Sequence, residues 1–313
     1  MWQTSADIES LKKRAEVLRC IRQYFYDKHV MEIDVPIIGA STVTDPYLDS
    51  ISLSLNKNTH YLQTSPEYFM KRALCAGVGD IFYLGKAFRQ DELGRRHSPE
   101  FTMLEWYRHD FDDLQLAQEL IDIVSLLSPG ISIHKYRYAD IFEQLVGIDP
   151  RIATSKALEI IAKNKCTIEW TNEPKETWLD FLFTHLVEPQ LQDGLYVIFD
   201  YPKEQAALAR VEKDEDDMFV AKRFEVFING MELANGYWEL SDKTEQLKRF
   251  EKNQKTRELL SKKPVDIDKK FMASLEQGLP DCSGVAMGID RLLMCLLNKN
   301  HIDDVNAFGF QYL

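Results

Sequence analysis

Phe88-Arg-Gln-Asp-Glu-Leu-Gly-Arg-Arg-His-Ser-Pro-Glu-Phe-Thr-Met-Leu-Glu-Trp-Tyr-Arg108 is the stretch of sequence on which the fold depends. Apolar runs at 81–88 and 101–106 flank a polar loop, a pattern that predicts a β-hairpin with its charges at the turn. An arginine at the end of a buried strand, such as Arg89, can hold its planar cation against a phosphate or carboxylate. Phe101 could stack on a purine ring. For an arbitrary charged loop, solvated ion pairs are the simpler interpretation.

The order of residues in this stretch resembles motif 2 of class II aminoacyl-tRNA synthetases, and 103–107 (Met-Leu-Glu-Trp-Tyr) resembles the lysine-specific branch. The resemblance implies that Arg89 holds the α-phosphate and the amino-acid carboxylate, and that Phe101 stacks on adenine. It also implies that the loop residues contact ATP; these are Gln90, Asp91, His97 and Ser98. Asp91 replaces the usual glutamate and Ser98 a common asparagine, so we expect changes in the fine geometry of the ATP loop and not in the reaction class.

Length and composition set the class of protein. The 313 residues are 45% hydrophobic, enough to bury a substantial core, and we expect a single domain over 1–313. The five cysteines lack metal-binding spacing, which favours reduced thiols in a cytoplasmic protein. No leader pattern or long apolar run is present, so we expect no membrane association. A net charge of −12 disfavours broad binding to nucleic-acid phosphates without excluding it.

The first 38 residues read as a helix followed by an extended segment. Apolar residues recur at three- and four-residue steps over 8–26, which predicts an amphipathic helix. Residues 30–38 read as a strand interrupted by Pro36. This order is similar to motif 1, which implies a homodimer interface, although an ordinary helix and edge strand are about as compatible with these residues. His29 stands where the family usually has glycine.

Residues 61–67 predict a strand that runs through a turn into a helix over 68–76. Glu67 in the first turn of that helix is most simply a favourable cap. Its position, 22 residues before Arg89, is similar to that of the lysine-type synthetases. The resemblance implies that Ser65, Pro66 and Glu67 contact the amino-acid substrate, with Glu67 receiving its amino group.

The middle of the chain carries little chemical signal. Asp112 is placed to cap an amphipathic helix that we interpret as packing. Residues 128–193 mix short helical and turn signals, and we interpret them as an insertion within the catalytic domain. Residues 194–201 predict a buried strand.

Asn229-Gly230 predicts a tight turn between strands in the segment 223–239. With a two-residue turn, Phe227 faces Glu232, and Glu225 lies diagonally on the same face. Two carboxylates there favour a cation such as Mg²⁺, while pairing of one carboxylate with a nearby arginine is equally compatible.

The same segment is similar to the lysyl-synthetase pattern. That resemblance implies that Glu225 and Glu232 hold ATP-bound Mg²⁺. It also implies that ATP is contacted by Glu232 and Leu233. The implied contacts of the lysine substrate are Asn235, Tyr237 and Glu239. Glu105, Tyr107 and Glu239 would then give two carboxylates and a hydroxyl around an ammonium group.

Residues 284–294 read as a small-residue strand entering an apolar helix, and they resemble motif 3. Gly288 would let a ligand approach the backbone, and Arg291 is a cation among apolar residues that requires a partner. The resemblance implies that Arg291 contacts ATP, while an internal salt bridge is the alternative. Three motifs in order imply the class II catalytic fold, an α+β domain with a mixed, mostly antiparallel sheet flanked by helices.

Motif 1 lies within the first helix and strand of the given sequence, so we expect no anticodon-binding domain of the kind that precedes motif 1 in lysyl-tRNA synthetases. The chain therefore resembles the free-standing bacterial paralogues that modify elongation factor P. Ala286 supports this, because it replaces the middle glycine of motif 3 and its methyl group could favour an amine one carbon further along the substrate. A conservative packing change is the alternative.

This resemblance implies activation of (R)-β-lysine by ATP and Mg²⁺ and its transfer to a lysine of elongation factor P, with no tRNA. Arg89 and Arg291 would stabilise charge at the α-phosphate, and no protein nucleophile is needed. Two other functions remain open. A minimal lysyl-tRNA synthetase-like enzyme would label tRNA, and a non-catalytic regulatory paralogue would form no adenylate.

Overall fold

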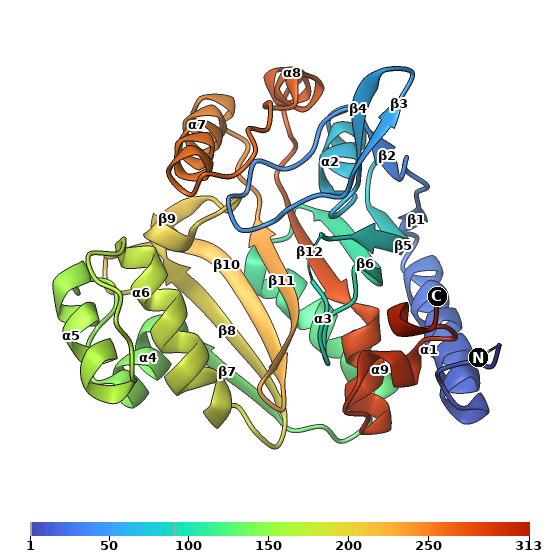
Figure 1. Ribbon diagram of the computed structural model, residues 1–313, viewed down its shortest axis with the longest axis horizontal. Coiled ribbons are helices and arrows are strands. Elements are labelled where there is room, and N and C mark those ends of the chain that lie inside the picture. Colours follow the sequence, from blue (N-terminus) through green and yellow to red (C-terminus); the bar gives the residue numbers. More distant parts are fainter. Residues whose placement is uncertain (1, 91) are drawn as a thin grey trace. The chain divides into compact units, whose positions relative to one another are not determined.

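The computed structural model describes residues 2–90 and 92–313, and the chain packs as two compact units. Unit 1 comprises Met1–Phe111 and Leu240–Leu313, and unit 2 comprises Asp112–Glu239. Figure 1 shows the elements that each unit contains. The single domain over 1–313, with 128–193 as an insertion, stays a prediction.

Unit 1 begins with the predicted amphipathic helix, α1 (Ile8–Asp27). The Asp7 side chain caps it by accepting the Ser10 N–H at 2.7 Å. Its buried face includes Phe25, whose ring stacks on Phe82 of the sheet at 4.6 Å between centroids. His29 follows with φ of 58°, a left-handed conformation that explains why glycine suits this position.

Four strands form the main sheet of unit 1, and they are ordered β1 (Met31–Glu32), β5 (Ile81–Phe88), β6 (Glu100–His109) and β12 (Cys282–Gly288). β1 is parallel to β5, and the other two pairings are antiparallel. β5 and β6 form the predicted hairpin, with Phe88 opposite Glu100. The strand predicted over 30–38 is shorter than expected: β1 ends at Glu32, Pro36 has no N–H to donate, and Ile38–Gly39 pairs with β4 in the small sheet instead.

The remaining elements of unit 1 are a small sheet and several helices. The sheet has the order β2 (Ile38–Gly39), β4 (Asn58–Leu62), β3 (Ser52–Leu55). The helices are α2 (Glu67–Cys75), α7 (Lys243–Leu259), α8 (Lys269–Gln277) and α9 (Ile289–Leu297), with 3₁₀ turns at Ile302–Val305 and Phe310–Tyr312. α9 begins directly after β12, as the small-residue strand and apolar helix of the sequence predict.

Unit 2 is built on a second run of strands, in the order β11 (Met231–Trp238), β10 (Phe219–Ile228), β8 (Leu195–Pro202) and β7 (Ile133–Arg137), with β9 (Val211–Lys213) paired to β10. β7 is parallel to β8, and the other pairings are antiparallel. β8 matches the strand predicted over 194–201.

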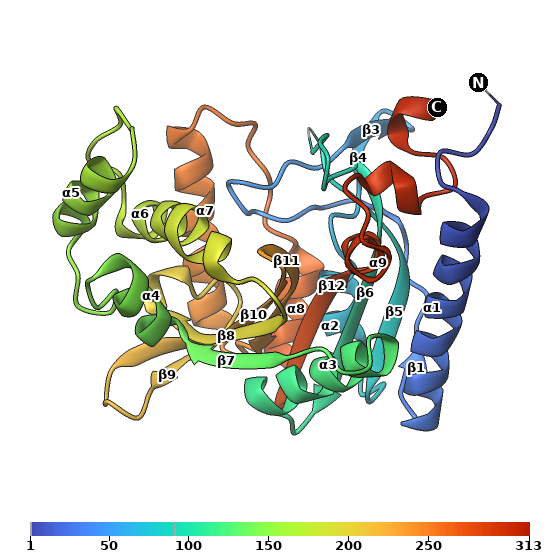
Figure 2. The same cartoon turned by 90° about the horizontal axis from the view of Figure 1, so that it is seen from below.

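Helices flank these strands (Figure 2). They are α3 (Asp113–Leu127), α4 (Tyr138–Val146), α5 (Ser155–Lys165) and α6 (Lys175–Leu182), followed by π and 3₁₀ turns at Phe183–Val187, Glu188–Gln190 and Lys203–Gln205. Asp112 caps α3, as expected, and Gln115 completes a capping box with it. The hydrophobic core under α4–α6 includes Tyr138, Trp178 and Phe227. The predicted α+β class, with a mixed and mostly antiparallel sheet flanked by helices, is confirmed.

Candidate active site

Arg89 leaves the end of β5 beside two motif 2 side chains. Its guanidinium carbon lies 5.2 Å from the centroid of the Phe101 ring, and its Nη1 lies 3.5 Å from Glu92 Oε1. No acceptor among the described residues bonds its buried Nε. The Arg89 guanidinium is thus a planar cation that lies on an aromatic ring and keeps one N–H donor for a ligand. This arrangement suits a nucleotide, whose phosphate could bind the cation beside its base. Asp91, which sequence reasoning also assigned to ATP, lies outside the described residues.

The motif 2 loop also meets motif 3. Gly94 and His97 pair as an isolated antiparallel bridge in the loop, and Ser98 after it is buried. Arg291 of α9 places Nη2 2.5 Å from His97 Nε2 and Nε 3.4 Å from the Arg96 carbonyl oxygen. The structure therefore brings the two predicted ATP-contacting segments of unit 1 together.

Gly288 is the N-cap residue of α9, with φ of −77°. A methyl group added to it would meet the Arg291 side chain at 3.8 Å or more, an ordinary contact. Its expected role in close approach of a ligand stays a prediction.

A buried ion pair underlies both motifs, and sequence reasoning missed it. Asp290, just before Arg291, accepts Arg14 Nη1 at 2.6 Å and the Thr102 N–H at 2.7 Å. Arg14 Nη2 donates to Thr102 Oγ1 at 2.6 Å. Arg14 of α1 thus bonds both Thr102, which follows Phe101, and Asp290, which precedes Arg291. No motif spacing reveals this, because the partners are far apart in the chain.

Glu105 and Tyr107 form a buried carboxylate and phenol pair on β6. The Tyr107 hydroxyl donates to Glu105 Oε1 at 2.8 Å, and both residues are about 2% exposed. Ala286 on β12 is the direct partner of Glu105 in the antiparallel register. The residue whose methyl group distinguishes this motif 3 therefore lies across from the carboxylate assigned to the substrate ammonium.

Glu67 opens α2 and holds a partner that sequence reasoning did not name. Pro66 is the N-cap residue, and Ser65 Oγ lies 3.4 Å from the Glu67 amide nitrogen. Glu67 Oε1 accepts Lys71 Nζ at 2.6 Å, and the Lys71 side chain is 1% exposed. The i,i+4 spacing could have suggested this pair. Any substrate amine at Glu67 must share the carboxylate with Lys71.

The hairpin in unit 2 has the predicted register, with Phe227 opposite Glu232 and Ile228 opposite Met231. A bulge follows at Val226/Phe227. Glu225 pairs with Arg223 and accepts the Tyr201 hydroxyl at 2.7 Å, so the alternative of an arginine partner is realised. Burial raises the pKa of the Glu225 carboxyl, Arg223 opposes that rise, and the charge of Glu232 adds to it.

The negative charge of Glu232 therefore acts on the Glu225 carboxyl. Carboxylate oxygens are the ligands that Mg²⁺ prefers. These two residues fit a role in holding a nucleotide-bound Mg²⁺. In the described parts of the chain, no group of three or more His, Cys, Asp or Glu side chains is placed to hold a metal ion. Phosphate oxygens would have to complete the coordination.

The other assigned residues of unit 2 follow on β11 and after it. Asn235 lies opposite Glu225, and its Nδ2 donates to the Tyr237 hydroxyl at 3.0 Å. Asn235 Oδ1 accepts Arg223 Nε at 3.2 Å. Leu233 and Glu239 are buried. Arg223 thus connects the assigned magnesium ligand Glu225 to the assigned substrate contacts, a role that sequence reasoning did not give it.

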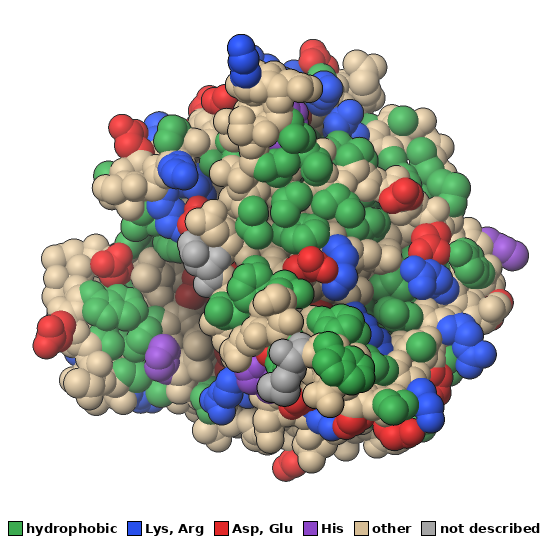
Figure 3. Space-filling model, turned by 45° about the vertical axis from the view of Figure 1, so that its right-hand side comes forward, with side chains coloured by type: hydrophobic (Ala, Val, Ile, Leu, Met, Phe, Trp, Pro, Cys, Tyr) green, Lys and Arg blue, Asp and Glu red, His purple; other side chains and the backbone are tan. Residues whose placement is uncertain are grey.

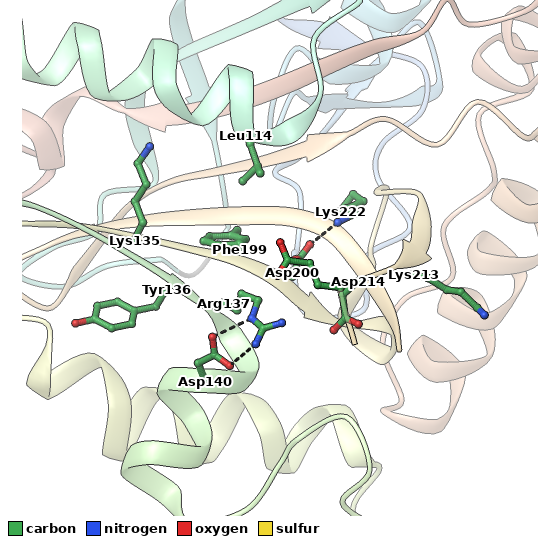
Figure 4. A pocket seen from close by; sticks show the side chains of 11 residues that line it. Leu114, Lys135, Tyr136, Arg137, Asp140, Phe199, Asp200, Lys213, Asp214 and Lys222 are labelled. Carbon is green, nitrogen blue, oxygen red and sulfur yellow. Dashed lines mark hydrogen bonds and ion pairs between the residues drawn. The ribbon is translucent and has the colours of Figure 1, made fainter. Parts of the chain in front are cut away.

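Unit 2 also contains a cavity of about 590 Å³ away from these assigned residues (Figure 4). Two ion pairs join residues that line it: Arg137 Nε lies 2.9 Å from Asp140 Oδ2, and Lys222 Nζ lies 2.7 Å from Asp200 Oδ1. We assign no ligand to this cavity.

Figure 3 shows hydrophobic side chains gathered on the face that it draws. Exposed large apolar residues of the motif 1 segment include Met31, Ile37 and Ile38. Over residues 2–90 and 92–313, no helix is long and apolar enough to cross a bilayer.

Comparison with known proteins defines the class to which this fold and these residues correspond. The family described as "tRNA synthetases class II (D, K and N)" matches residues 2–311, and the chain belongs to that family. Three curated relatives are each named elongation factor P–(R)-β-lysine ligase. Those from Haemophilus ducreyi, Mannheimia succiniciproducens and Pseudoalteromonas translucida are 41%, 43% and 42% identical. The alignments cover 98 to 99% of this chain and 96 to 97% of the relatives.

Proposed function

We propose that this protein activates (R)-β-lysine with ATP as an adenylate and transfers the β-lysyl group to a lysine ε-amine of elongation factor P. The observation that carries the proposal is the similarity to named ligases of that reaction along almost the whole length of the chain. The buried pair of Glu105 and Tyr107 supports it, because a desolvated carboxylate with a hydroxyl suits a substrate ammonium.

In the first step, a substrate carboxylate oxygen attacks the α-phosphorus, and the bond to pyrophosphate breaks. Arg89 and Arg291 offset the charge that builds on the α-phosphate, and Phe101 stacks on adenine. The further ATP contacts that we propose are Gln90, Asp91, His97, Ser98, Glu232, Leu233 and Gly288. Bound Mg²⁺ neutralises phosphate charge, and Glu225 and Glu232 are the residues proposed to hold it.

In the second step, the ε-amine nitrogen of the acceptor attacks the carbonyl carbon, and AMP leaves. The substrate is held by its two amino groups. Glu67 receives the β-amino group through the carboxylate that it shares with Lys71. The contacts proposed for the rest of the substrate are Ser65, Pro66, Glu105, Tyr107, Asn235, Tyr237, Glu239 and Ala286.

The proposal extends to assembly and setting. The exposed apolar residues of the motif 1 segment support a homodimer formed there. We place the enzyme in the bacterial cytoplasm, where its protein acceptor is available, and assign it no tRNA and no membrane partner.

Acceptor labelling tests the proposed function. Purified protein with ATP, Mg²⁺ and labelled (R)-β-lysine or α-lysine is offered elongation factor P and bulk tRNA in parallel. Label on the factor, strongest with β-lysine, is the expected result. Label on tRNA would establish a minimal synthetase instead, and absence of adenylate with either amino acid would indicate a regulatory paralogue.

A further inference from the structure

Arg257 on α7 anchors a segment of unit 1 that lies far from it in sequence. Its side chain is 4% exposed, and its guanidinium bonds four separate acceptors. Nη1 donates to the carbonyl oxygens of Asp45 and Leu48 at 2.7 and 3.2 Å. Nη2 donates to Asp49 Oδ1 at 2.9 Å, and Nε donates to the Lys263 carbonyl oxygen at 3.1 Å. The planar fork therefore fixes the backbone of 45–49 in one arrangement.

A second cation, Lys262, also binds the Asp49 carboxylate. Lys262 Nζ donates to Asp49 Oδ2 at 2.7 Å, so each carboxylate oxygen has its own cation. The hydrogen bond from Lys262, aided by Arg257, lowers the pKa of Asp49, which keeps the carboxylate charged. The described segment 42–50 forms no regular helix or strand, so contacts such as these, together with those of Thr42 with Ser50 and of Asn253 with Thr44, hold it in place.

A backbone hydrogen bond joins the anchored segment to the hairpin that carries Arg89. The Gln90 N–H donates to the Asp49 carbonyl oxygen at 2.8 Å, directly after Arg89. The Arg89 N–H donates to the Pro99 carbonyl oxygen at 2.9 Å, within the hairpin itself. Because Gln90 is held by 45–49, the path of the chain on leaving Arg89 depends on the segment that Arg257 fixes.

We propose that Arg257 is a positioning residue for adenylate formation, acting through Asp49 and Gln90 on the direction in which Arg89 leaves its strand. The inference rests on the role of Arg89 in the proposed function. In the proposed function Arg257 contacts neither ATP nor the amino acid. A displacement of about 1 Å at a group that stabilises the transition state can cost about 100-fold in rate.

The test compares Arg257→Met with a matched control, Lys243→Met, in the full-length protein. Lys243 lies on the same helix and pairs with Glu276 at 2.8 Å, away from 42–50. We measure adenylate formation from ATP and (R)-β-lysine in a single turnover, which separates the number of active sites from the rate constant at each. Arg257→Met is expected to lower the rate constant about 10- to 100-fold with a smaller change in KM for ATP, and Lys243→Met is expected to leave both unchanged.

A purely structural role for Arg257 would lower the number of active sites and leave the rate constant unaltered, and that result would overturn the proposal. Asp49→Asn is the milder variant if Arg257→Met folds poorly. It removes the charge that Arg257 and Lys262 share but keeps the Asp49 carbonyl. A loss in rate with the site count retained is expected of this variant too, and it should combine non-additively with Arg257→Met.

Hydrogen exchange separates failure of this inference from failure of the proposed function. The Gln90 amide should exchange faster in Arg257→Met than in Lys243→Met, whether or not any adenylate forms. Unchanged exchange there refutes the anchor by itself. A wild-type protein that forms no adenylate refutes the proposed function and leaves the exchange result to decide whether Arg257 holds Gln90.

Discussion

Replacing Arg14 by methionine should destabilise unit 1 more than any surface change on α1. The Arg14 side chain is 15% exposed and its partner Asp290 is 2% exposed, so the ion pair at 2.6 Å is largely removed from water. Methionine keeps the apolar stem and removes the cation. Asp290 would retain the Thr102 N–H as a donor but lose its counter-charge.

The expected magnitude follows from burial. Removing one partner of a buried ion pair costs about 3–5 kcal/mol, because the other charge stays desolvated. The chain has 313 residues, and unfolding entropy is about 2.1 cal/mol/K per residue, so its melting temperature should fall by about 5–8 °C.

Calorimetry measures the shift, and hydrogen exchange at the Thr102 amide locates it. Lys12→Met is the control, because Lys12 is 69% exposed in its pair with Glu9 and should contribute about 0–1 kcal/mol. Adding Asp290→Asn to Arg14→Met should recover part of the loss, since no uncompensated charge remains. The reasoning is refuted if Arg14→Met melts with the Lys12 control, or if the double variant is no more stable than Arg14→Met.

Two further predictions concern a titrating carboxyl and substrate choice. Burial raises the pKa of Asp113 to about 6, and no donor among the described residues reaches its Oδ2. Between about pH 4 and 6 the folded state therefore holds a proton that the unfolded chain has lost, so the free energy of unfolding falls as pH rises through that window. Asp113→Asn should remove this pH dependence and raise the free energy of unfolding by up to about 3 kcal/mol above pH 6. Urea unfolding at pH 4 and pH 8 measures both effects. Ala286→Gly should raise kcat/KM for α-lysine relative to (R)-β-lysine by about 10-fold or more, because one methyl group in a pocket contributes about 1–3 kcal/mol to discrimination. Pyrophosphate exchange measures this ratio, and an unchanged ratio would show that Ala286 is a packing residue.

Local patterns predicted much of the fold. The turn at Asn229-Gly230 set the register of its hairpin, and the Asp112 capping box set the start of α3. Both depend on interactions within a few residues, which sequence displays directly. His29 shows the limit, because the sequence says only that a histidine stands where the family usually has glycine, and the structure is needed to show that this histidine adopts a left-handed conformation.

The charged partners of the assigned site were beyond sequence reasoning. Lys71 was visible at i,i+4 from Glu67, but the same spacing occurs on most exposed helices and does not distinguish a buried pair from a solvated one. An arginine partner for one of the two carboxylates was the open alternative, and only the side-chain arrangement shows that Arg223 pairs with Glu225. Sequence names the residues of each motif; it does not state which cations they already hold.

The long-range contacts explain why the motifs alone are an incomplete description of the site. Arg14 joins the segments after Phe101 and before Arg291, and Arg257 fixes the backbone beyond Arg89. Neither arginine is among the residues that the motifs assign to the site, and each bonds acceptors more than 80 positions away in the chain. A multidentate guanidinium is suited to this, because one rigid fork can hold several backbone and carboxylate oxygens at once. Preorganised electrostatic catalysis needs cations held in place before substrate arrives, so under the proposed function we expect the chemistry to depend on Arg14 and Arg257 as well as on the arginines proposed to contact ATP.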